Sequence, residues 1–268
     1  MIGSIANNRF LQRVNPEIKR ALNETGAAAS MRQMVDLDIA KNLVGWWHKD
    51  NVETRVSGSD TFITQANDSS GGTNHATQTT EANQPELVSD GMEFESDLLD
   101  MGLGSILNII NGANAVTMSV WVYGNNWNNQ SWIVYGIINS SLLGVSIRIN
   151  VTNPMVGGRS HSSDSFQSLI SSREINLAQW YHFVGIVNYT TSQFYIYIDG
   201  EQDSTGSANF SQNKFTGGTP TLSDRIGNHP TSGRDVDGRL NDIRIYNKTL
   251  SASEIAAIHN QTKGAYGL

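Results

Sequence analysis

The sequence predicts an all-β protein whose two antiparallel sheets pack face to face as a jelly-roll sandwich, preceded by a short helical N-terminal arm. Apolar and polar residues alternate in several short segments after Gly45, which is the period of half-buried strands. Turn sequences such as Ser70-Gly71-Gly72 and Asn153-Pro154 separate these segments. Helical periodicity is confined to the two ends of the chain, so we expect one β domain over residues 45–268.

The arm, residues 1–44, is predicted to contain two short helices. Asn15 and Pro16 supply a cap and a first helical residue, and Gly26 can end this helix. A second helical stretch follows over residues 27–44. The apolar positions of the arm are Ile18, Leu22, Met31, Met34 and Leu37. They are too few to form a core, so we expect the arm to anchor the chain to another subunit or a larger protein shell.

Strands are predicted most clearly in the middle of the domain. Residues 118–122, 145–149 and 181–187 alternate between two faces. A dense aromatic and aliphatic run over residues 194–198 meets Asp199-Gly200, a dipeptide typical of two-residue hairpin turns. We therefore expect residues 181–198 and the segment after the turn to lie side by side in one antiparallel sheet.

A closing helix is predicted at the C-terminal end. Residues 240–246 alternate as a strand, and the helix then begins with Ser251 as N-cap and Glu254 three residues later. Leu250 is placed to pack on Ile255 across the first turn, as a hydrophobic staple does. The last strand should therefore run directly into a short capped helix.

Composition excludes several classes of function. The formal net charge of -7 and the absence of any basic run argue against a nucleic-acid partner. With no cysteine, disulfides and thiolate metal sites are excluded. No segment has the length and apolarity of a membrane span, and the first residues lack the apolar stretch of a secretion signal. We therefore expect the chain to be made in the cytoplasm.

Four segments together resemble a laminin G-like domain of the concanavalin A-like lectin/glucanase superfamily. They are LVGWWHKDN with NDSSGGTNHATQT and GMEFESDLLDMG; VTMSVWVYG; QWYHFVGIVNYTTSQFYIYIDGEQ; and RIGNHP with DGRLNDIRIYNKTLSASEI. The resemblance covers roughly residues 43–260. It implies two sheets, one of them concave, a last strand that returns beside the first, and a capped helix that closes one end. It also implies roles from glycan binding and adhesion to glycan hydrolysis in distant relatives.

Glu93, Glu95 and Asp97 are the candidate catalytic residues of an alternative, enzymatic interpretation. Alternate residues on a strand lie ~7 Å apart. That spacing resembles the ~6.5–9.5 Å between the two carboxyls of inverting glycosidases. Their order departs from the glucanase pattern, however, and the stretch matches a non-catalytic strand and turn of laminin G-like domains. A solvated acidic edge or a cation site is the simpler interpretation.

One structural Ca²⁺ is a second hypothesis, which rests on the resemblance. Asp68 and Asp242 match positions near which relatives hold an ion, and Asp235 and Asp237 lie in a neighbouring loop. Calcium binds carboxylate and carbonyl oxygens, often from loops. The alternative is that these aspartates cap turns.

Glycan contact is expected from Trp127, Asn128 and Trp132. The two indoles flank amides in what is predicted to be a polar loop after a strand. An exposed indole can stack on a sugar while amides bond its hydroxyls. The alternative is that these residues anchor the rim of the loop.

The sequence thus favours a non-enzymatic structural or adhesion protein. A virion component fits best, as a phage head-decoration or tail-associated protein that displays the jelly roll and binds surface glycans. Its protein partners would be copies of itself or a capsid or tail protein, reached through the arm. The alternative functions are a glycoside hydrolase of the glucanase type and a soluble lectin, and the alternative location is the cytoplasm.

Overall fold

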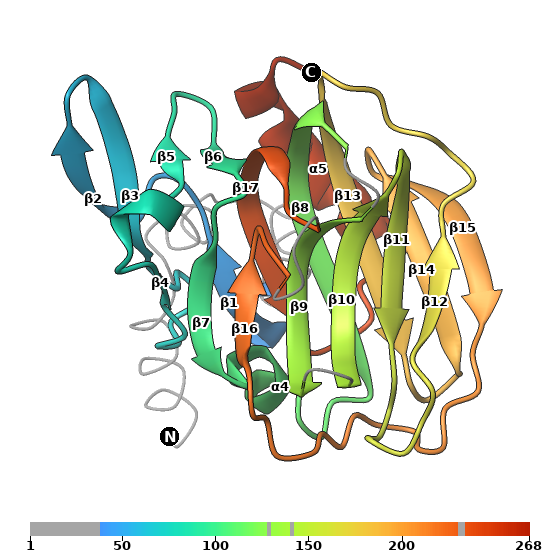
Figure 1. Ribbon diagram of the computed structural model, residues 1–268. Coiled ribbons are helices and arrows are strands. Elements are labelled where there is room, and N and C mark those ends of the chain that lie inside the picture. The colour runs from blue at the N-terminus through green and yellow to red at the C-terminus, as the bar shows by residue number, and fades with distance from the viewer. Residues whose placement is uncertain (1–37, 128–129, 140–141, 230–233) are drawn as a thin grey trace, which may run out of the picture.

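The computed structural model describes residues 38–127, 130–139, 142–229 and 234–268 (Figure 1). The five apolar arm positions singled out above, and Asn128, lie outside the described residues. The chain forms a two-layered antiparallel β-sandwich, which confirms the predicted fold class. Within the described residues, no helix combines the length and apolarity that crossing a membrane requires.

The back sheet of the sandwich contains six strands in the order β1-β17-β8-β13-β14-β15, all antiparallel to their neighbours. Their bounds are β1 Leu43–Trp47, β17 Asp237–Tyr246, β8 Ala115–Asn126, β13 Trp180–Asn188, β14 Gln193–Ile198 and β15 Glu201–Ser207. The last strand therefore pairs with the first, as the resemblance implies.

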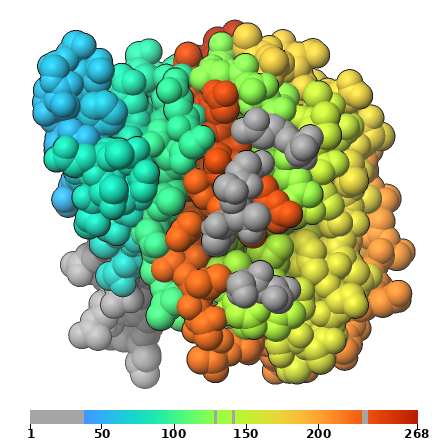
Figure 2. Space-filling view, viewed as in Figure 1, coloured from blue at the N-terminus to red at the C-terminus, as the bar shows by residue number. Residues whose placement is uncertain are grey.

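The front sheet, nearest the viewer in Figure 1, has the order β7-β16-β9-β10-β11-β12. Its strands are β7 Leu99–Leu103, β16 Ser223–Ile226, β9 Ser131–Asn139, β10 Leu142–Asn150, β11 Asn153–Gly158 and β12 Gln167–Ile170. Figure 2 shows the orange segment around β16 lying between the teal β7 side and the green β9 side. Distant parts of the sequence thus meet in the middle of this sheet.

Short strands link the two sheets at one edge. They are β2 Val52–Ser57, β3 Asp60–Ala66, β4 Ala76–Thr77, β5 Glu86–Leu87 and β6 Met92–Glu95. β6 pairs with β17 of the back sheet, and β4 pairs with β7 of the front sheet. The β2–β3 hairpin extends from this edge (Figure 1). The helices that lie wholly within the described residues are η1 Glu81–Asn83, α4 Ser105–Ile109, α5 Ala252–Thr262 and η2 Lys263–Tyr266.

The main core fills the space between the two sheets. Val120 and Phe183 of the back sheet and Val145 and Ile147 of the front sheet are buried together there. These are positions that the alternating pattern placed on one face of each strand. Burying apolar side chains on both inner faces is what stabilises a sandwich of this size.

A second apolar layer lies on the outer side of the back sheet, beneath α5. Tyr246, Leu250 and Ile255 pack there with Val184 and Ile186, so the predicted staple contact forms. Ser251 caps α5 with a complete capping box, since its side chain accepts from Glu254 N and the Glu254 carboxylate accepts from Ser251 N. The predicted closing helix is confirmed.

The predicted hairpin is also present. Asp199 and Gly200 have φ values of 55° and 83°, and Ile198 pairs with Glu201 across the turn. Two successive residues with positive φ define the turn that matches the twist of the strands. β13, β14 and β15 therefore form a continuous meander.

Candidate functional site

The outer surface of the front sheet carries a group of aromatic and cationic side chains. We call Trp132, Tyr135, Arg148, His229 and Arg234 the front-face cluster. β9 supplies its two large aromatic residues, and β10 supplies Arg148 opposite Trp132 in the register. Ile133 and Val134, which lie between the two aromatic residues on β9, belong to the main core, whereas Trp132 and Tyr135 face outward. A register shift leaves Ile133 as an extra residue on β9, which puts Trp132 on the same outer face as Tyr135 and Arg148.

The rings of the front-face cluster form a compact stack. The guanidinium carbon of Arg148 lies 4.2 Å from the centroid of the Trp132 ring. The His229 ring lies 4.6 Å from Trp132 and 5.3 Å from Tyr135, measured between centroids. Trp132 and Tyr135 meet edge to face at 5.8 Å. Arg234 is tied to the stack through its carbonyl, which accepts the Trp132 backbone N–H at 3.2 Å.

Positive charge is concentrated in this cluster. Arg148 is only 8% exposed, and burial and then the nearby Arg234 lower its pKa to about 10. Burial, followed by Arg234, Arg148 and Arg225, lowers the pKa of His229 to about 4, so this imidazole is neutral near pH 7. Arg225 is opposed by Asp100, whose carboxylate lies 3.9 Å from it. Neither Arg148 nor Arg234 has an ion pair among the described residues.

Trp132 is the one member of this cluster that was a candidate from the sequence, but the environment expected for it was wrong. The expectation that Trp132 lies in a polar loop is wrong, because it lies in β9 and is 1% exposed. It can therefore position Arg148 and His229 but offers no open ring to a ligand. Trp127 is half-buried and packs over Gly124, where an added Cβ would lie 2.3 Å from the indole. The two tryptophans do not form a common stacking platform.

The acidic residues of the enzymatic alternative do not line one strand. β6 ends at Glu95, and Ser96 follows with a φ of 72°, so Asp97 lies beyond a turn. Asp97 accepts the Glu95 N–H at 2.9 Å, and burial raises its pKa to about 6. Glu93 lies 3.6 Å from the guanidinium of Arg239. The expectation that all three carboxylates share a strand face is therefore wrong.

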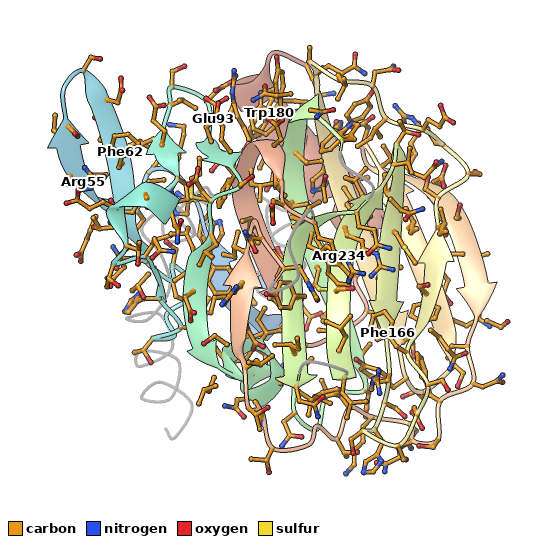
Figure 3. All side chains as sticks on the ribbon, viewed as in Figure 1. Arg55, Phe62, Glu93, Phe166, Trp180 and Arg234 are labelled. Atoms are coloured by element: carbon orange, nitrogen blue, oxygen red, sulfur yellow. The ribbon has the colours of Figure 1, made fainter. Side chains whose placement is uncertain are left out.

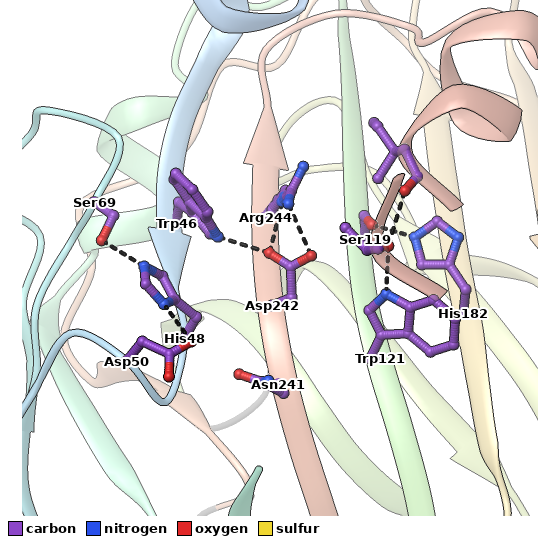
Figure 4. Close-up of polar contacts among 12 residues, drawn as sticks. Trp46, His48, Asp50, Ser69, Ser119, Trp121, His182, Asn241, Asp242 and Arg244 are labelled. Carbon is purple, nitrogen blue, oxygen red and sulfur yellow. Dashed lines mark hydrogen bonds and ion pairs between the residues drawn. The ribbon is translucent and has the colours of Figure 1, made fainter. Parts of the chain in front are cut away.

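Two of the proposed calcium ligands, Asp68 and Asp242, meet at Trp46, where the first and last strands pair. Figure 4 shows the bond between Trp46 and Asp242. Asp68 accepts the Trp46 backbone N–H at 3.1 Å and the Ser70 N–H at 2.9 Å. Asp242 accepts the Trp46 indole N–H at 2.7 Å and pairs with Arg244 through two bonds of 2.7 and 2.8 Å. Protein donors therefore already bind the carboxylate oxygens of both aspartates.

The other two candidate ligands lie elsewhere. Asp237 begins β17 opposite Glu95, and burial raises the pKa of Asp235. In the part of the chain that the structure describes, no group of three or more His, Cys, Asp or Glu side chains is arranged to hold a metal. Calcium binding stays a prediction from the resemblance.

A buried serine and histidine beneath α5 resemble a nucleophile and its base. Ser119 Oγ lies 2.8 Å from His182 Nε2, with Trp121 stacked beside the imidazole (Figure 4). Both residues are at most 1% exposed, and burial lowers the pKa of His182 to about 3. No substrate reaches such a pair, so its role here is to fill the layer between sheet and helix.

The sequence offered no local signal for the front-face cluster. Arg148 was recognisable only as an outward position on an alternating strand, and His229 and Arg234 follow about 80 residues later. The topology brings them together because β16 lies beside β9. Figure 3 shows Arg234 at the level of β10 and β11, well apart from Glu93 at the upper rim.

Comparison with solved structures finds the same fold in several proteins at low identity. The sialidase of Trypanosoma rangeli matches at 14% identity and a TM-score of 0.56, over 84% of this chain and 33% of that chain. The ligand-binding domain of botulinum neurotoxin serotype D, solved with N-acetylneuraminic acid, matches at 15% identity and a TM-score of 0.55, over 84% of this chain and 52% of that chain. This chain thus spans about a third to a half of these two proteins.

A smaller structure is matched over nearly its whole length. Domain 4 of AbnA, an extracellular arabinanase from Geobacillus stearothermophilus solved with arabinotriose, matches at 14% identity and a TM-score of 0.52, over 81% of this chain and 98% of that domain. Comparison with curated proteins gives no match. A laminin G-like family model, described as the concanavalin A-like lectin/glucanases superfamily, matches residues 103–256, which is more than half of the sequence. The chain therefore belongs to the concanavalin A-like lectin/glucanases superfamily.

Proposed function

We propose that this protein is a non-enzymatic adhesion domain that binds glycans through the front-face cluster. The observation that carries the proposal is a pair of arginines, Arg148 and Arg234, that lie beside an aromatic base in the middle of a sheet and have no acidic partner among the described residues. Guanidinium groups offer several N–H donors in a fixed plane, which suits the closely spaced oxygens of a sugar. The likeness to domains solved with arabinotriose or N-acetylneuraminic acid supports this function.

The geometry of the acidic residues supports binding over hydrolysis. A glycosidase needs one carboxyl that donates a proton and a second one facing it across the bond to be cleaved. Glu93 is held by Arg239, and Asp97 is bonded to the backbone next to Glu95. Glu93 also lies well apart from the front-face cluster (Figure 3).

A glycan array with the full chain tests this proposal. We expect selective binding to a subset of glycans, and no release of sugar when the bound glycans are incubated with the protein and analysed by mass spectrometry. The Glu93→Gln variant should bind as the natural chain does, because Glu93 lies outside the site. Glycan cleavage that Glu93→Gln abolishes would establish the hydrolase alternative instead.

We further propose that the N-terminal arm joins the domain to a larger assembly, with a virion as the best candidate. The described end of the arm is fixed on the domain, because Ile39 packs against the apolar layer beneath α5 and Asp38 pairs with Lys248 at 2.5 Å. Asp38 and Ile39 therefore lie on the back of the sandwich, on the side of α5. An anchor that continues from this end would engage a partner on the side opposite the front sheet, where we propose that the glycan binds.

Removing residues 1–37 should separate assembly from folding. We expect a truncated chain beginning at Asp38 to keep its melting temperature within about 3 °C, since the contacts of Ile39 and Asp38 remain. It should also keep glycan binding but elute as a monomer, whereas the full chain forms oligomers or cosediments with particles. Normal assembly of the truncated chain would place the anchor elsewhere.

A further inference from the structure

Arg148 is a cation that the fold leaves without a counter-ion among the described residues. Its side chain is almost completely buried, its Nε donates to the Met155 sulfur at 3.1 Å, and one face of its guanidinium covers Trp132. Its two terminal nitrogens make no hydrogen bond to the residues that the structure describes. Burying a charged group is costly unless an opposite charge or several hydrogen bonds compensate for it.

The surroundings of Arg148 increase this cost. Arg234 is close enough to lower the pKa of Arg148, so two like charges lie near each other. Arg225 adds a third cation near His229, although Asp100 opposes it. The whole chain carries a net charge of -7, so this local surplus runs against the average charge of the molecule. A fixed cluster of cations is therefore a feature that an anionic ligand would stabilise.

We infer that the front-face cluster binds the carboxylate of an acidic sugar, with Arg148 and Arg234 as its cationic ligands. This inference rests on the proposed glycan-binding function and names the class of glycan. A carboxylate can accept two parallel N–H bonds from one guanidinium, and charge-assisted bonds of this kind are stronger than neutral ones. Trp132 acts as a positioning residue, because its ring lies against the Arg148 guanidinium, 4.2 Å from its carbon.

The test compares matched glycans on the full chain. A panel of carboxylated oligosaccharides, including 3′-sialyllactose and oligogalacturonates, is measured by calorimetry beside the same compounds with the carboxyl group reduced to an alcohol. Lactose serves as a neutral probe and a heparin-derived disaccharide as a sulfated one. We expect at least one carboxylated compound to bind, and its reduced form to bind at least about tenfold more weakly.

Variants then assign the effect to the cluster. Arg148→Gln and Arg234→Gln should each weaken binding of the carboxylated glycan about tenfold or more. Arg148→Lys keeps the charge but loses the planar guanidinium that can donate two parallel N–H bonds, so this variant should retain only part of the affinity of the natural chain. The matched control is Arg55→Gln, which removes another arginine stacked on a ring, that of Phe62 at 4.7 Å, on the β2–β3 hairpin (Figure 3). Arg55→Gln should bind as the natural chain does.

The outcomes separate the inference from the proposed function. Equal binding of carboxylated and reduced glycans, or binding of neutral or sulfated glycans alone, overturns the inference and leaves glycan binding intact. No binding across the panel and the array contradicts both. Arg234 is only half-buried, so Arg234→Gln still decides the question if the melting curve of Arg148→Gln shows that this variant does not fold.

Discussion

Replacing Asp224 with alanine is expected to lower the free energy of unfolding by about 3–5 kcal/mol, because it leaves three buried backbone donors without an acceptor. Asp224 lies on β16 and is completely buried. One of its carboxylate oxygens accepts the N–H groups of Ile106 and Leu107 at 2.6 and 3.4 Å, and the other accepts Ile137 N–H at 2.8 Å. Since Gly104, the residue before α4, has no side chain, Asp224 caps this helix from a distant strand.

Chemical denaturation of the variant measures this loss. The matched control is Asp203→Ala, because Asp203 also accepts several bonds, from Ser171, Ser172 and Ser204, but is half-exposed. Water can replace Asp203 as an acceptor, so we expect its loss to cost ~1 kcal/mol or less. Equal effects of the two substitutions would contradict the account of Asp224.

Acid is expected to destabilise the protein through His182. Burial lowers the pKa of this imidazole to about 3 in the folded state, whereas an exposed histidine has a pKa of 6.5. Its stabilising contribution is therefore fully present above pH 6.5 and is lost as the pH falls towards 3, because the unfolded chain takes up the proton first. Between pH 7 and pH 5 this contribution falls by about 2 kcal/mol.

Buried carboxyl groups change the free energy of unfolding in the opposite direction as the pH falls. The contribution of His182 must therefore be measured as the difference between the natural chain and a variant that lacks this imidazole. Burial raises the pKa of Asp224 to about 7, and this group favours the folded state as the pH falls. We therefore compare the natural chain with His182→Gln at pH 5 and pH 7. The variant should be less stable at both values but should lose about 2 kcal/mol less on acidification. If the free energies of unfolding of the natural chain and of His182→Gln change equally between pH 7 and pH 5, His182 does not take up a proton on unfolding.

The layered architecture could be predicted because it depends on local patterns. Alternation on residues 118–122 and 145–149 identified the core faces, and Ser251 with Glu254 identified the start of α5. The pattern could not reveal the irregularity at Asp242, where a φ of 50° accompanies a register shift in β17. That shift depends on pairing with β8, a strand more than a hundred residues away.

The front-face cluster could not be predicted either, because it too depends on pairing between strands that are distant in the sequence. Trp132 was identified by its polar flanking residues, yet its exposure is determined by Arg148 and His229, which the topology brings to its ring. Likewise the sequence shows no run of basic residues, although the fold brings Arg148, Arg225 and Arg234 around one imidazole. Long-range strand pairing creates such a cluster, and local sequence patterns do not encode it.

The most direct test of glycan binding at the front sheet is a crystal structure of the full chain with the glycan that binds most tightly on the array. We expect electron density for the sugar on the outer surface of β9 and β10, with sugar oxygens within about 3 Å of the terminal nitrogens of Arg148 or Arg234. Density for the glycan at the rim beside Glu93, or on the back sheet, would contradict glycan binding at the front sheet.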